Sequence, residues 1–397
     1  MNTPATSKMG PTRLELGEVT IANWRTLPYS RWSFHHAREV LPTEEIEAGE
    51  KTISLKSMPL DLDDLLFEGL QGQQWTLKRL FSESETSGFI VVQDNNVVLE
   101  RYFNGLIPSR PHLIFSVSKS VTGILAGILA EKGIIDLGVT AETYIPEVIG
   151  SCYENCPIQN ILDMSVDTSF TESYLDLDGD YGRYRESTGW NPYTDPANLP
   201  DLRSFLATLK PGTGKHGDVF HYVTPNTDFM GWLMERASGK TYATLISEYL
   251  WKPMGAERNA YVTVDRLGAA RAGGGICATI RDMARIGMIM RDAGQALSKS
   301  VIPAWWIKDT LTTGDRDAWV KGSFINLLPE GCYRNYWYQT RNDRGAYFAL
   351  GIHGQWIYID PKSKTVIAKV SAQKDPENDL LDQVHLRAFK TICSALD

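Results

Sequence analysis

Ser116 and Lys119 stand three positions apart and open an apolar run, residues 121–130, that contains Ala and Gly. On a helix such a pair lies on one face, so the two side chains can touch. A serine hydroxyl becomes a good nucleophile only when a neighbouring base takes its proton, and a buried lysine can be that base. Because a free lysine titrates near ~10.4, burial or another cation must first lower its pKa. The pair therefore predicts nucleophilic catalysis, with Ser116 attacking and Lys119 accepting the proton.

The same spacing occurs a second time, at Ser371 and Lys374, so it is a weak signal by itself. The second pair ends a strand-like run and is followed by Asp375-Pro376, whereas the first opens a helix that is apolar on most of its circumference. The alternative for the first pair is an ordinary helix start with a surface lysine. The remaining parts of the site must decide between the two interpretations.

A third group is needed to pass a proton to the leaving group, and a phenol suits this because one atom can donate or accept. The candidate is Tyr222, which lies in a strand-like segment just before a predicted helix that is capped near Asn226. The chain has 17 tyrosines, so the setting and not the residue type favours this one.

An oxyanion hole needs two backbone N–H groups aimed at the developing negative charge. The N–H of Ser116 is expected to be one of them. The second is expected from a strand edge in residues 349–355, where Gly351 lets a substrate approach the main chain. A simple β-bulge is the alternative interpretation of that glycine.

The elements before the Ser116 helix are predicted from periodicity and turn residues. Residues 1–60 are polar and irregular and predict an extended arm, and residues 61–84 predict a helix. Residues 89–93 and 97–103 are joined across Asp94-Asn95-Asn96, which predicts a β-hairpin leading to the catalytic helix.

The middle of the chain is predicted to be helical and rich in loops. Strand signals nearly vanish in residues 134–275, and helices are expected at 199–210, 226–238 and 241–252. Residues 176–198 predict a solvated loop over a cleft, because their acidic cluster lacks the glutamate that ends a calcium loop.

The last third of the chain returns to strand patterning. Strands are expected at residues 333–339, 346–351, 355–359 and 365–370, and helices at 279–292, 304–311 and 378–396. Strands near both ends with helices between them predict one sheet and an inserted helical lobe, an α/β (α+β) class with an antiparallel sheet flanked by helices. The predicted division is an N-terminal arm (1–60), a sheet lobe (61–133 and 276–397) and a helical lobe (134–275), with the active site at the seam.

Composition excludes several classes of function. The net charge of −8 argues against nucleic acid, and no run approaches the ~18 apolar residues of a membrane span. Without the apolar core of a signal peptide near the N-terminus, a cytoplasmic location is expected, with the five cysteines reduced. No metal is expected, because the cysteines and histidines are scattered. The glycines of residues 273–275 lack a following Gly-Lys-Ser/Thr, so no nucleotide cofactor is expected either.

Together, the Ser116-x-x-Lys119 pair, Tyr222-x-Thr224 and the late Gly351 strand resemble the serine β-lactamase and penicillin-recognising family. The similarity is greatest to its class C and family VIII esterase branch, and within it to the 6-aminohexanoate-dimer (nylon-oligomer) hydrolases. It covers most of the chain. It implies a serine β-lactamase/DD-peptidase-like fold and hydrolysis through an acyl-enzyme.

The resemblance also implies roles for single residues. Ser116 would be the nucleophile, Lys119 its proton acceptor and Tyr222 the proton relay, with the N–H groups of Ser116 and Ile352 forming the oxyanion hole. Tyr174 falls where these hydrolases place a tyrosine against the scissile amide; packing of a loop aromatic on the body is the alternative.

Two positions depart from the nylon-oligomer pattern. Arg185 aligns where efficient dimer hydrolases carry an aspartate for the substrate's ammonium, and an arginine would repel that group. Glu186 would substitute only if the loop shifted by one residue. Gly273 stands where an asparagine can line the cleft. These departures bear on the substrate and leave the serine chemistry untouched.

The leading hypothesis is therefore a serine hydrolase of short-chain carboxylic esters and linear amides such as 6-aminohexanoate oligomers, with a small-molecule substrate and, as one alternative for its assembly, a homodimer. A β-lactamase or D-alanyl-D-alanine peptidase is less favoured, because Ala349-Leu350-Gly351 replaces the usual Lys-Thr/Ser-Gly strand. A scaffold without catalysis predicts an eroded catalytic position, and none is eroded. An α/β-hydrolase is excluded by the absence of Gly-x-Ser-x-Gly.

Overall fold

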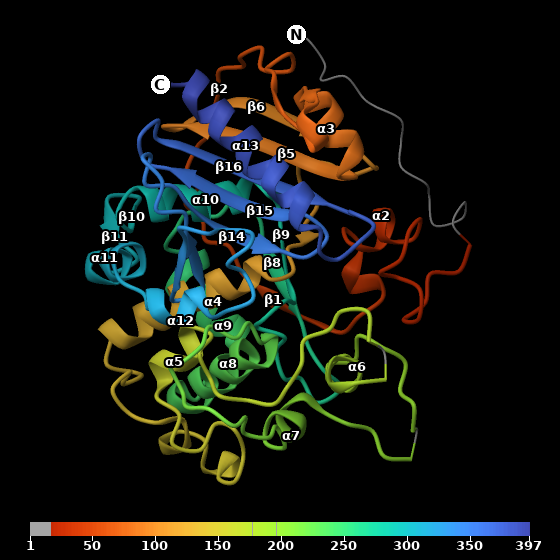
Figure 1. The fold of residues 1–397 in the computed structure, drawn as a ribbon, viewed down its shortest axis with the longest axis vertical. Helices are drawn as coiled ribbons and strands as arrows, with labels where there is room; N and C mark the ends of the chain where they lie inside the picture. The colour runs from red at the N-terminus through yellow and green to blue at the C-terminus, as the bar shows by residue number, and fades with distance from the viewer. Residues whose placement is uncertain (1–16, 177, 196) are drawn as a thin grey trace.

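An eight-stranded sheet organises the molecule (Figure 1). The computed structural model describes residues 17–397 apart from residues 177 and 196. The strand order is β12-β13-β14-β15-β16-β5-β6-β2, and neighbours are antiparallel except for β2 and β6. Strands from opposite ends of the chain meet in the middle of the sheet, where Ile367 of β16 lies opposite Val91 of β5.

The strands fall into two main sheets. The large sheet consists of Lys56–Ser57 (β2), Thr86–Gln93 (β5), Asn96–Tyr102 (β6), Cys332–Arg334 (β12), Trp337–Gln339 (β13), Tyr347–Gly351 (β14), Gln355–Asp360 (β15) and Thr365–Ser371 (β16). The four-stranded sheet, in the order β1-β8-β9-β7, consists of Thr43–Ile46, Ala260–Thr263, Ile276–Ala278 and His112–Leu113. Two small hairpins are Phe67–Glu68 with Gln74–Trp75 (β3, β4) and Gln295–Ala296 with Lys299–Ser300 (β10, β11).

The helices differ widely in length. Their bounds are Ser30–Ser33 (α2), Leu77–Glu83 (α3), Val117–Glu131 (α4), Ile158–Leu162 (α5), Asp180–Ser187 (α6), Leu202–Leu206 (α7), Thr224–Ser238 (α8), Tyr242–Ile246 (α9), Ile280–Arg291 (α10), Ala304–Thr312 (α11), Arg316–Val320 (α12) and Asp379–Ala395 (α13). Helix α9 continues directly into a π-helical turn, Ser247–Trp251. No helix in the described part of the chain combines the length and apolarity needed to cross a bilayer.

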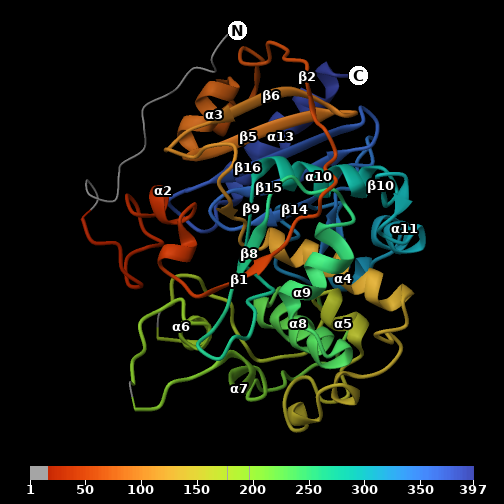
Figure 2. The ribbon, with the colours of Figure 1, turned by 180° about the vertical axis from the view of Figure 1, so that it is seen from behind.

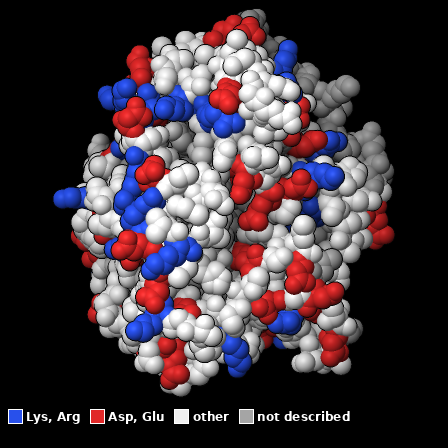
Figure 3. Space-filling view, in the orientation of Figure 1, with Lys and Arg blue, Asp and Glu red and all other residues white. Residues whose placement is uncertain are grey.

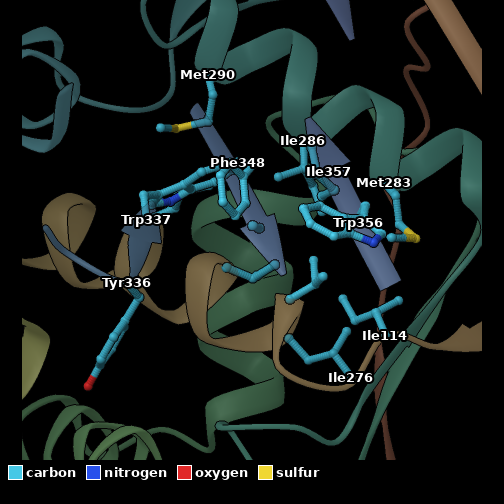
Figure 4. Packing of buried hydrophobic residues seen from close by; sticks show 14 of the residues in the cluster. Ile114, Ile276, Met283, Ile286, Met290, Tyr336, Trp337, Phe348, Trp356 and Ile357 are labelled. Carbon is cyan, nitrogen blue, oxygen red and sulfur yellow. The ribbon is translucent and has the colours of Figure 1, made fainter. Parts of the chain in front are cut away.

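Helices α10 and α13 cover opposite faces of the large sheet, as the front and back views show (Figures 1 and 2). Alternate residues of β15 point to opposite faces. Trp356 packs against Phe389 of α13 with the ring centroids 5.6 Å apart, whereas Ile357 lies beneath α10 at Gly287. Figure 4 shows Met283, Ile286 and Met290 of α10 directed toward the sheet. Complete burial of each such side chain contributes roughly 1.5–3 kcal/mol.

Helix α4 lies under the sheet and is buried from Val117 to Leu129. Two glycines allow this close packing. A Cβ on Gly123 would lie 2.2 Å from the Asn335 carbonyl oxygen, and one on Gly127 would lie 2.3 Å from the Trp306 ring. Helices α5, α7, α8 and α9 gather on the side of α4 away from the sheet (Figure 1). Helix α4 is therefore held between the sheet and these helices.

Several predicted elements agree with the structure. The hairpin of β5 and β6 is confirmed, as are β14, β15, β16, α4, α8, α10 and α13 within a few residues. The expected fold class, an antiparallel sheet flanked by helices, is also confirmed.

The predicted helix at residues 61–84 is wrong over most of its length, because only Leu77–Glu83 is α-helical and Leu70–Gly72 forms a short 3₁₀ turn. Residues before it form the hairpin of β3 and β4, in which Trp75 packs so closely on Gly69 that a Cβ there would lie 2.3 Å from the indole. Gly72, at φ +72°, turns the chain between the two strands.

Other predictions need smaller corrections. The segment 176–198 is not wholly a loop, because α6 forms within it and buries Tyr181 and Tyr184. The expected strand 333–339 is two strands, since Asn335 and Tyr336 turn the chain at positive φ. Strand β8 lies within the segment expected to lack strands, and it pairs with β1 from the N-terminal region.

Candidate active site

The lysine and the serine at the start of α4 are in direct contact. Lys119 Nζ donates a hydrogen bond to Ser116 Oγ at 2.7 Å and another to the Gly273 carbonyl oxygen, also at 2.7 Å. Both acceptors are uncharged, and among the described residues no carboxylate accepts a hydrogen bond from the amine. The geometry allows Lys119 to take the Ser116 proton once the amine is neutral.

The protein environment makes a neutral Lys119 accessible near neutral pH. Burial is the main cause and lowers its pKa to about 7; the charge of Arg271 acts in the same direction, while Glu172 and Asp228 oppose it. Only 1% of the residue is exposed, so the ammonium form loses its hydration.

Ser116 is aimed by the residue before it. Phe115 has φ +45°, an uncommon value for a bulky residue, and its ring packs against Phe34 and His353. Ser116 then occupies the N-cap position of α4, yet its hydroxyl makes no cap hydrogen bond to the helix. The hydroxyl is therefore available to Lys119 and to a substrate.

Tyr222 lies on the other side of the pair, just before α8. Lys119 Nζ lies 4.9 Å from the centre of its ring, and Tyr222 and Ser116 line the same pocket. Burial, followed by the charge of Glu172, raises the pKa of Tyr222 well above its usual value, and a hydrogen bond with Ser116 only partly opposes this. The phenol thus stays protonated near neutral pH and can donate.

The end of β14 lies against the start of α4. A Cβ on Gly351 would lie 2.8 Å from the Ile114 carbonyl oxygen and 3.0 Å from the Ser116 nitrogen. Across the described residues, neither the Ser116 N–H nor the Ile352 N–H donates to another protein group. Two unpaired donors beside one nucleophile are what an oxyanion hole requires.

The loop after β14 is fixed by its neighbours. His353 donates its backbone N–H to the Pro376 carbonyl, and its Nδ1 lies 2.7 Å from the Gln373 carbonyl oxygen. Burial lowers the pKa of His353 to about 4, so the ring is neutral. The adjacent Ile352 N–H is held in place as a result.

A buried ion pair supports the carbonyl that holds Lys119. Asp228 Oδ1 accepts the Gly273 N–H at 2.6 Å, and Asp228 Oδ2 pairs with Arg271 at 3.0 Å. The Arg271 guanidinium also lies over the rings of Tyr184 and Trp190. Gly273 therefore belongs to the site through its backbone.

Two adjoining hollows open at this site, and Ser116 lines the first of them. They share Tyr174, Tyr222 and Phe324. The first also contains Gly351 and Ile352. The expected tyrosine Tyr174 thus lines the same hollow as Ser116, and its hydroxyl donates to Glu172 at 2.7 Å.

Arg185 and Glu186 line neither hollow. Arg185 is only 6% exposed and lies over the Tyr181 ring, 4.8 Å from its centre. Glu186 accepts hydrogen bonds from Thr194. The expected repulsion of a substrate amine by Arg185 stays a prediction.

Sequence reasoning missed several polar residues around the site. Asp228 belongs to Asn226-Thr227-Asp228, a motif at the family's spacing, but no role was assigned to it. Arg271 was not singled out, and neither were the four acidic residues that line the hollows: Glu172, Glu377, Asp379 and Asp382. Only Glu172 could have been found from the sequence, because it lies two residues before the predicted site residue Tyr174. Over the described residues, no group of three or more His, Cys, Asp or Glu side chains is placed to hold a metal ion.

The fold and the site agree with the protein family that sequence comparison identifies. The family profile named Beta-lactamase matches residues 78–390, and the chain belongs to this family. More particularly, the chain is 34% identical over 367 residues to the 6-aminohexanoate-dimer hydrolase of Paenarthrobacter ureafaciens, covering 91% of this chain and 90% of that one.

Solved structures agree with this placement. A Bacillus anthracis protein provisionally named a 6-aminohexanoate-dimer hydrolase superposes with a TM-score of 0.87 at 30% identity, covering 96% of this chain and 97% of that one. A class C β-lactamase superposes at 0.58 and 14% identity, covering 80% and 94%, which shows the common fold alone. The resemblance inferred from the sequence is confirmed.

Proposed function

We propose that this protein is a serine hydrolase that forms an acyl-enzyme on Ser116 and hydrolyses short-chain carboxylic esters and linear amides. One observation carries the proposal: a buried lysine with its pKa lowered to about 7 donates a 2.7 Å hydrogen bond to a serine hydroxyl. That serine lines a hollow together with a phenol.

In acylation, neutral Lys119 takes the Ser116 proton as Oγ bonds to the substrate carbonyl carbon. The carbonyl oxygen becomes an oxyanion, which the N–H groups of Ser116 and Ile352 stabilise. When the tetrahedral intermediate collapses, the bond to the leaving group breaks and Tyr222 donates its proton to the departing oxygen or nitrogen. The lysine ammonium then returns a proton to Tyr222, so the acyl-enzyme forms with no net change in protons.

In deacylation, a water molecule replaces the leaving group. Its proton passes to the Tyr222 and Lys119 pair as its oxygen bonds to the acyl carbon, and the intermediate releases Ser116 Oγ, which takes that proton back. The carboxylic acid leaves and the site returns to its first state. The same three side chains therefore serve both half-reactions.

The substrate class rests on the site and on the relatives. The curated relative is named for a linear amide dimer, which supports amide hydrolysis here. The hollows contain no Lys or Arg among the described residues, so they lack a cation for a β-lactam carboxylate. We therefore place esters and linear amides ahead of β-lactams.

The test is a side-by-side panel of p-nitrophenyl esters, 6-aminohexanoate dimer and nitrocefin, with Ser116→Ala as the decisive variant. We expect burst kinetics with the esters, an acyl adduct on Ser116 in the intact mass, and slow nitrocefin turnover. Ser120→Ala is the matched control, since this serine lies one turn further along α4 and bonds to the Tyr336 carbonyl. Ester hydrolysis that persists in Ser116→Ala contradicts the mechanism, and rapid nitrocefin turnover contradicts the substrate class.

A further inference from the structure

Arg185, in the last turn of α6, has a buried guanidinium that no described protein group satisfies. Its Nε and Nη2 are buried and make no hydrogen bond among the described residues. The guanidinium lies over the ring of Tyr181, and within the described part of the chain no carboxylate pairs with it. An arginine in a protein keeps its proton, so it cannot escape the cost of burial by becoming neutral.

Arg25 brings a second guanidinium to the same place. It lies in the segment before α2, where its Nη2 donates to Asn191 Oδ1 and its Nε has no partner among the described residues. The backbone N–H of Trp190, next to Asn191, donates to the Arg185 carbonyl oxygen at 2.9 Å. Trp24 Nε1 in turn donates to the Trp190 carbonyl oxygen at 3.2 Å. This turn therefore holds both arginines near the end of α6.

The positive charges here outnumber the negative ones. Burial and then the charge of Arg185 lower the pKa of Arg25 to about 9, so Arg25 is still charged at neutral pH. Arg271 adds a third charge that acts on both. It is paired with Asp228, the one carboxylate that forms an ion pair with this arginine cluster (Arg25, Arg185 and Arg271) over the described residues. A buried charge without a counter-charge is costly.

The hollows beside Ser116 are poor places for an anion. Their charged side chains are acidic, and among the described residues no Lys or Arg lines either of them. In Figure 3 acidic side chains gather around the hollowed middle of this face. Such a lining lowers the local concentration of anions. An anion that binds in this region is therefore expected at the arginine cluster.

We propose that a small oxyanion binds between the guanidinium groups of Arg25 and Arg185, outside the two hollows. A guanidinium is planar and presents parallel N–H donors, which match two oxygens of a carboxylate or a phosphate. The donors without a protein partner among the described residues are Nε and Nη2 of Arg185 and Nε of Arg25. The inference goes beyond the proposed function, since it does not require Ser116 to react.

The oxyanion has two possible sources with the same chemistry. One is inorganic phosphate, and the other is a carboxylic acid such as the one that ester hydrolysis releases. In either case the anion would connect the segment before α2 to α6, two parts of the chain about 160 positions apart. An anion that binds only the folded chain stabilises it.

The experiment titrates the whole chain with inorganic phosphate and, separately, with acetate and butyrate. Sodium chloride keeps the ionic strength constant, so that the general effect of salt on stability does not change during the titration. Calorimetry gives the Kd and the number of sites, and thermal unfolding gives Tm at each concentration. We expect one site per chain and a rise in Tm that saturates. Tighter binding of phosphate indicates the inorganic source, and tighter binding of acetate or butyrate indicates the carboxylic acid.

Arg185→Gln and Arg25→Gln should each raise the Kd by about tenfold or more, because each removes charged hydrogen-bond donors. Both should also reduce the rise in Tm. Arg183→Gln is the matched control: Arg183 lies two positions earlier on α6 and pairs with Asp180 in an exposed ion pair, so the Kd should stay at the wild-type value. Binding that is absent in wild type, or that is unchanged in both Arg185→Gln and Arg25→Gln, overturns the inference.

Two further measurements separate this inference from the proposed function. Ser116→Ala should bind the oxyanion with the wild-type Kd, whatever its effect on ester hydrolysis. Competitive inhibition of ester hydrolysis by phosphate, with an inhibition constant equal to the Kd, would place the anion in the hollows and overturn the inference. If Arg185→Gln does not fold, the titrations of wild type and Arg25→Gln still decide.

Discussion

The carbonyl oxygen of Gly273 accepts a 2.7 Å hydrogen bond from Lys119 Nζ, although 154 positions separate the two residues. The contact joins the loop before β9 to helix α4, which begins at Ser116. It gives the amine a second neutral acceptor besides Ser116, so the lysine is held in place without a carboxylate that would stabilise its charge. The Gly273 carbonyl therefore helps to position Lys119 for the proposed proton transfer from Ser116.

Gly273→Ala should lower activity strongly. Its Cβ would lie 2.8 Å from Thr224 Cγ2 and 3.0 Å from the Thr224 carbonyl oxygen, so the loop or the start of α8 must shift and the Lys119 acceptor moves with it. Overpacking of this kind costs about 1–3 kcal/mol. The neighbouring Gly274→Ala is the control, because its Cβ would meet nothing closer than 3.8 Å. Ester kcat/KM and the thermal unfolding temperature are measured for both variants. If Gly273→Ala and Gly274→Ala had the same kcat/KM, the proposed role of the Gly273 carbonyl would be wrong.

The pH dependence of ester hydrolysis should follow the lysine. With its pKa lowered to about 7, Lys119 is protonated and inactive below this value and neutral above it. For a neutral p-nitrophenyl ester, kcat/KM should fall about tenfold per pH unit below the pKa and level off above it. Since Glu377 and Asp382 also titrate nearby, the profile is repeated in the double variant Glu377→Gln/Asp382→Asn, where the rise near pH 7 should remain. A rate that is flat or that falls between pH 6 and 8 in that variant would exclude Lys119 as the base.

Tyr222→Phe should separate amides from activated esters. An amide nitrogen cannot leave without a proton, whereas p-nitrophenolate can, so the amide rate should drop by about 10²- to 10⁴-fold and the ester rate by much less. Single-turnover rates on 6-aminohexanoate dimer and on a p-nitrophenyl ester provide the comparison within one variant. An equal loss on both substrates would argue that Tyr222 acts on the Ser116 proton and not on the leaving group.

Asp228→Asn should destabilise the fold as well as the site. It leaves the Arg271 guanidinium buried without its anion, and breaking a buried ion pair in this way costs about 3–5 kcal/mol. Glu147→Gln is the matched control, because its ion pair with Arg236 is exposed and contributes at most about 1 kcal/mol. Urea unfolding of the two variants gives the free energies. If both variants lost a similar free energy of unfolding, the ion pair of Asp228 with Arg271 would not be buried as described.

Patterns in short stretches of sequence correctly predicted several strands and the contact between Ser116 and Lys119. Residues 355–360 and 365–371 form strands because their apolar runs are bounded by turn residues, and the contact of Ser116 with Lys119 follows from their spacing on one helical turn. The failure at residues 61–76 has the opposite cause. Its charged and leucine residues imitate a helical face, but the packing of Trp75 on Gly69, a tertiary contact, decides the structure there.

The rest of the site depends on chain folding. Nothing in the local sequence distinguishes Asp228 or Asp382 from a carboxylate on the surface, since both lie on ordinary helices. Their burial is set by elements that are distant in the sequence: Arg271 and Gly273 around Asp228, and β14 and its following loop around the hollow that Asp382 lines. Sequence spacing alone therefore does not identify site residues whose properties depend on burial by distant parts of the chain.

The pairing of β5 with β16 has a consequence for biosynthesis. During translation β5 and β6 emerge early, but the neighbour that covers the other edge of β5 is made only after residue 365. Until then, this edge of the nascent hairpin presents unpaired backbone groups, which are prone to join other chains. Ribosomes stalled before residue 365 should therefore carry chains that bind holdase chaperones, and this binding should decline once β16 has left the ribosome and paired with β5.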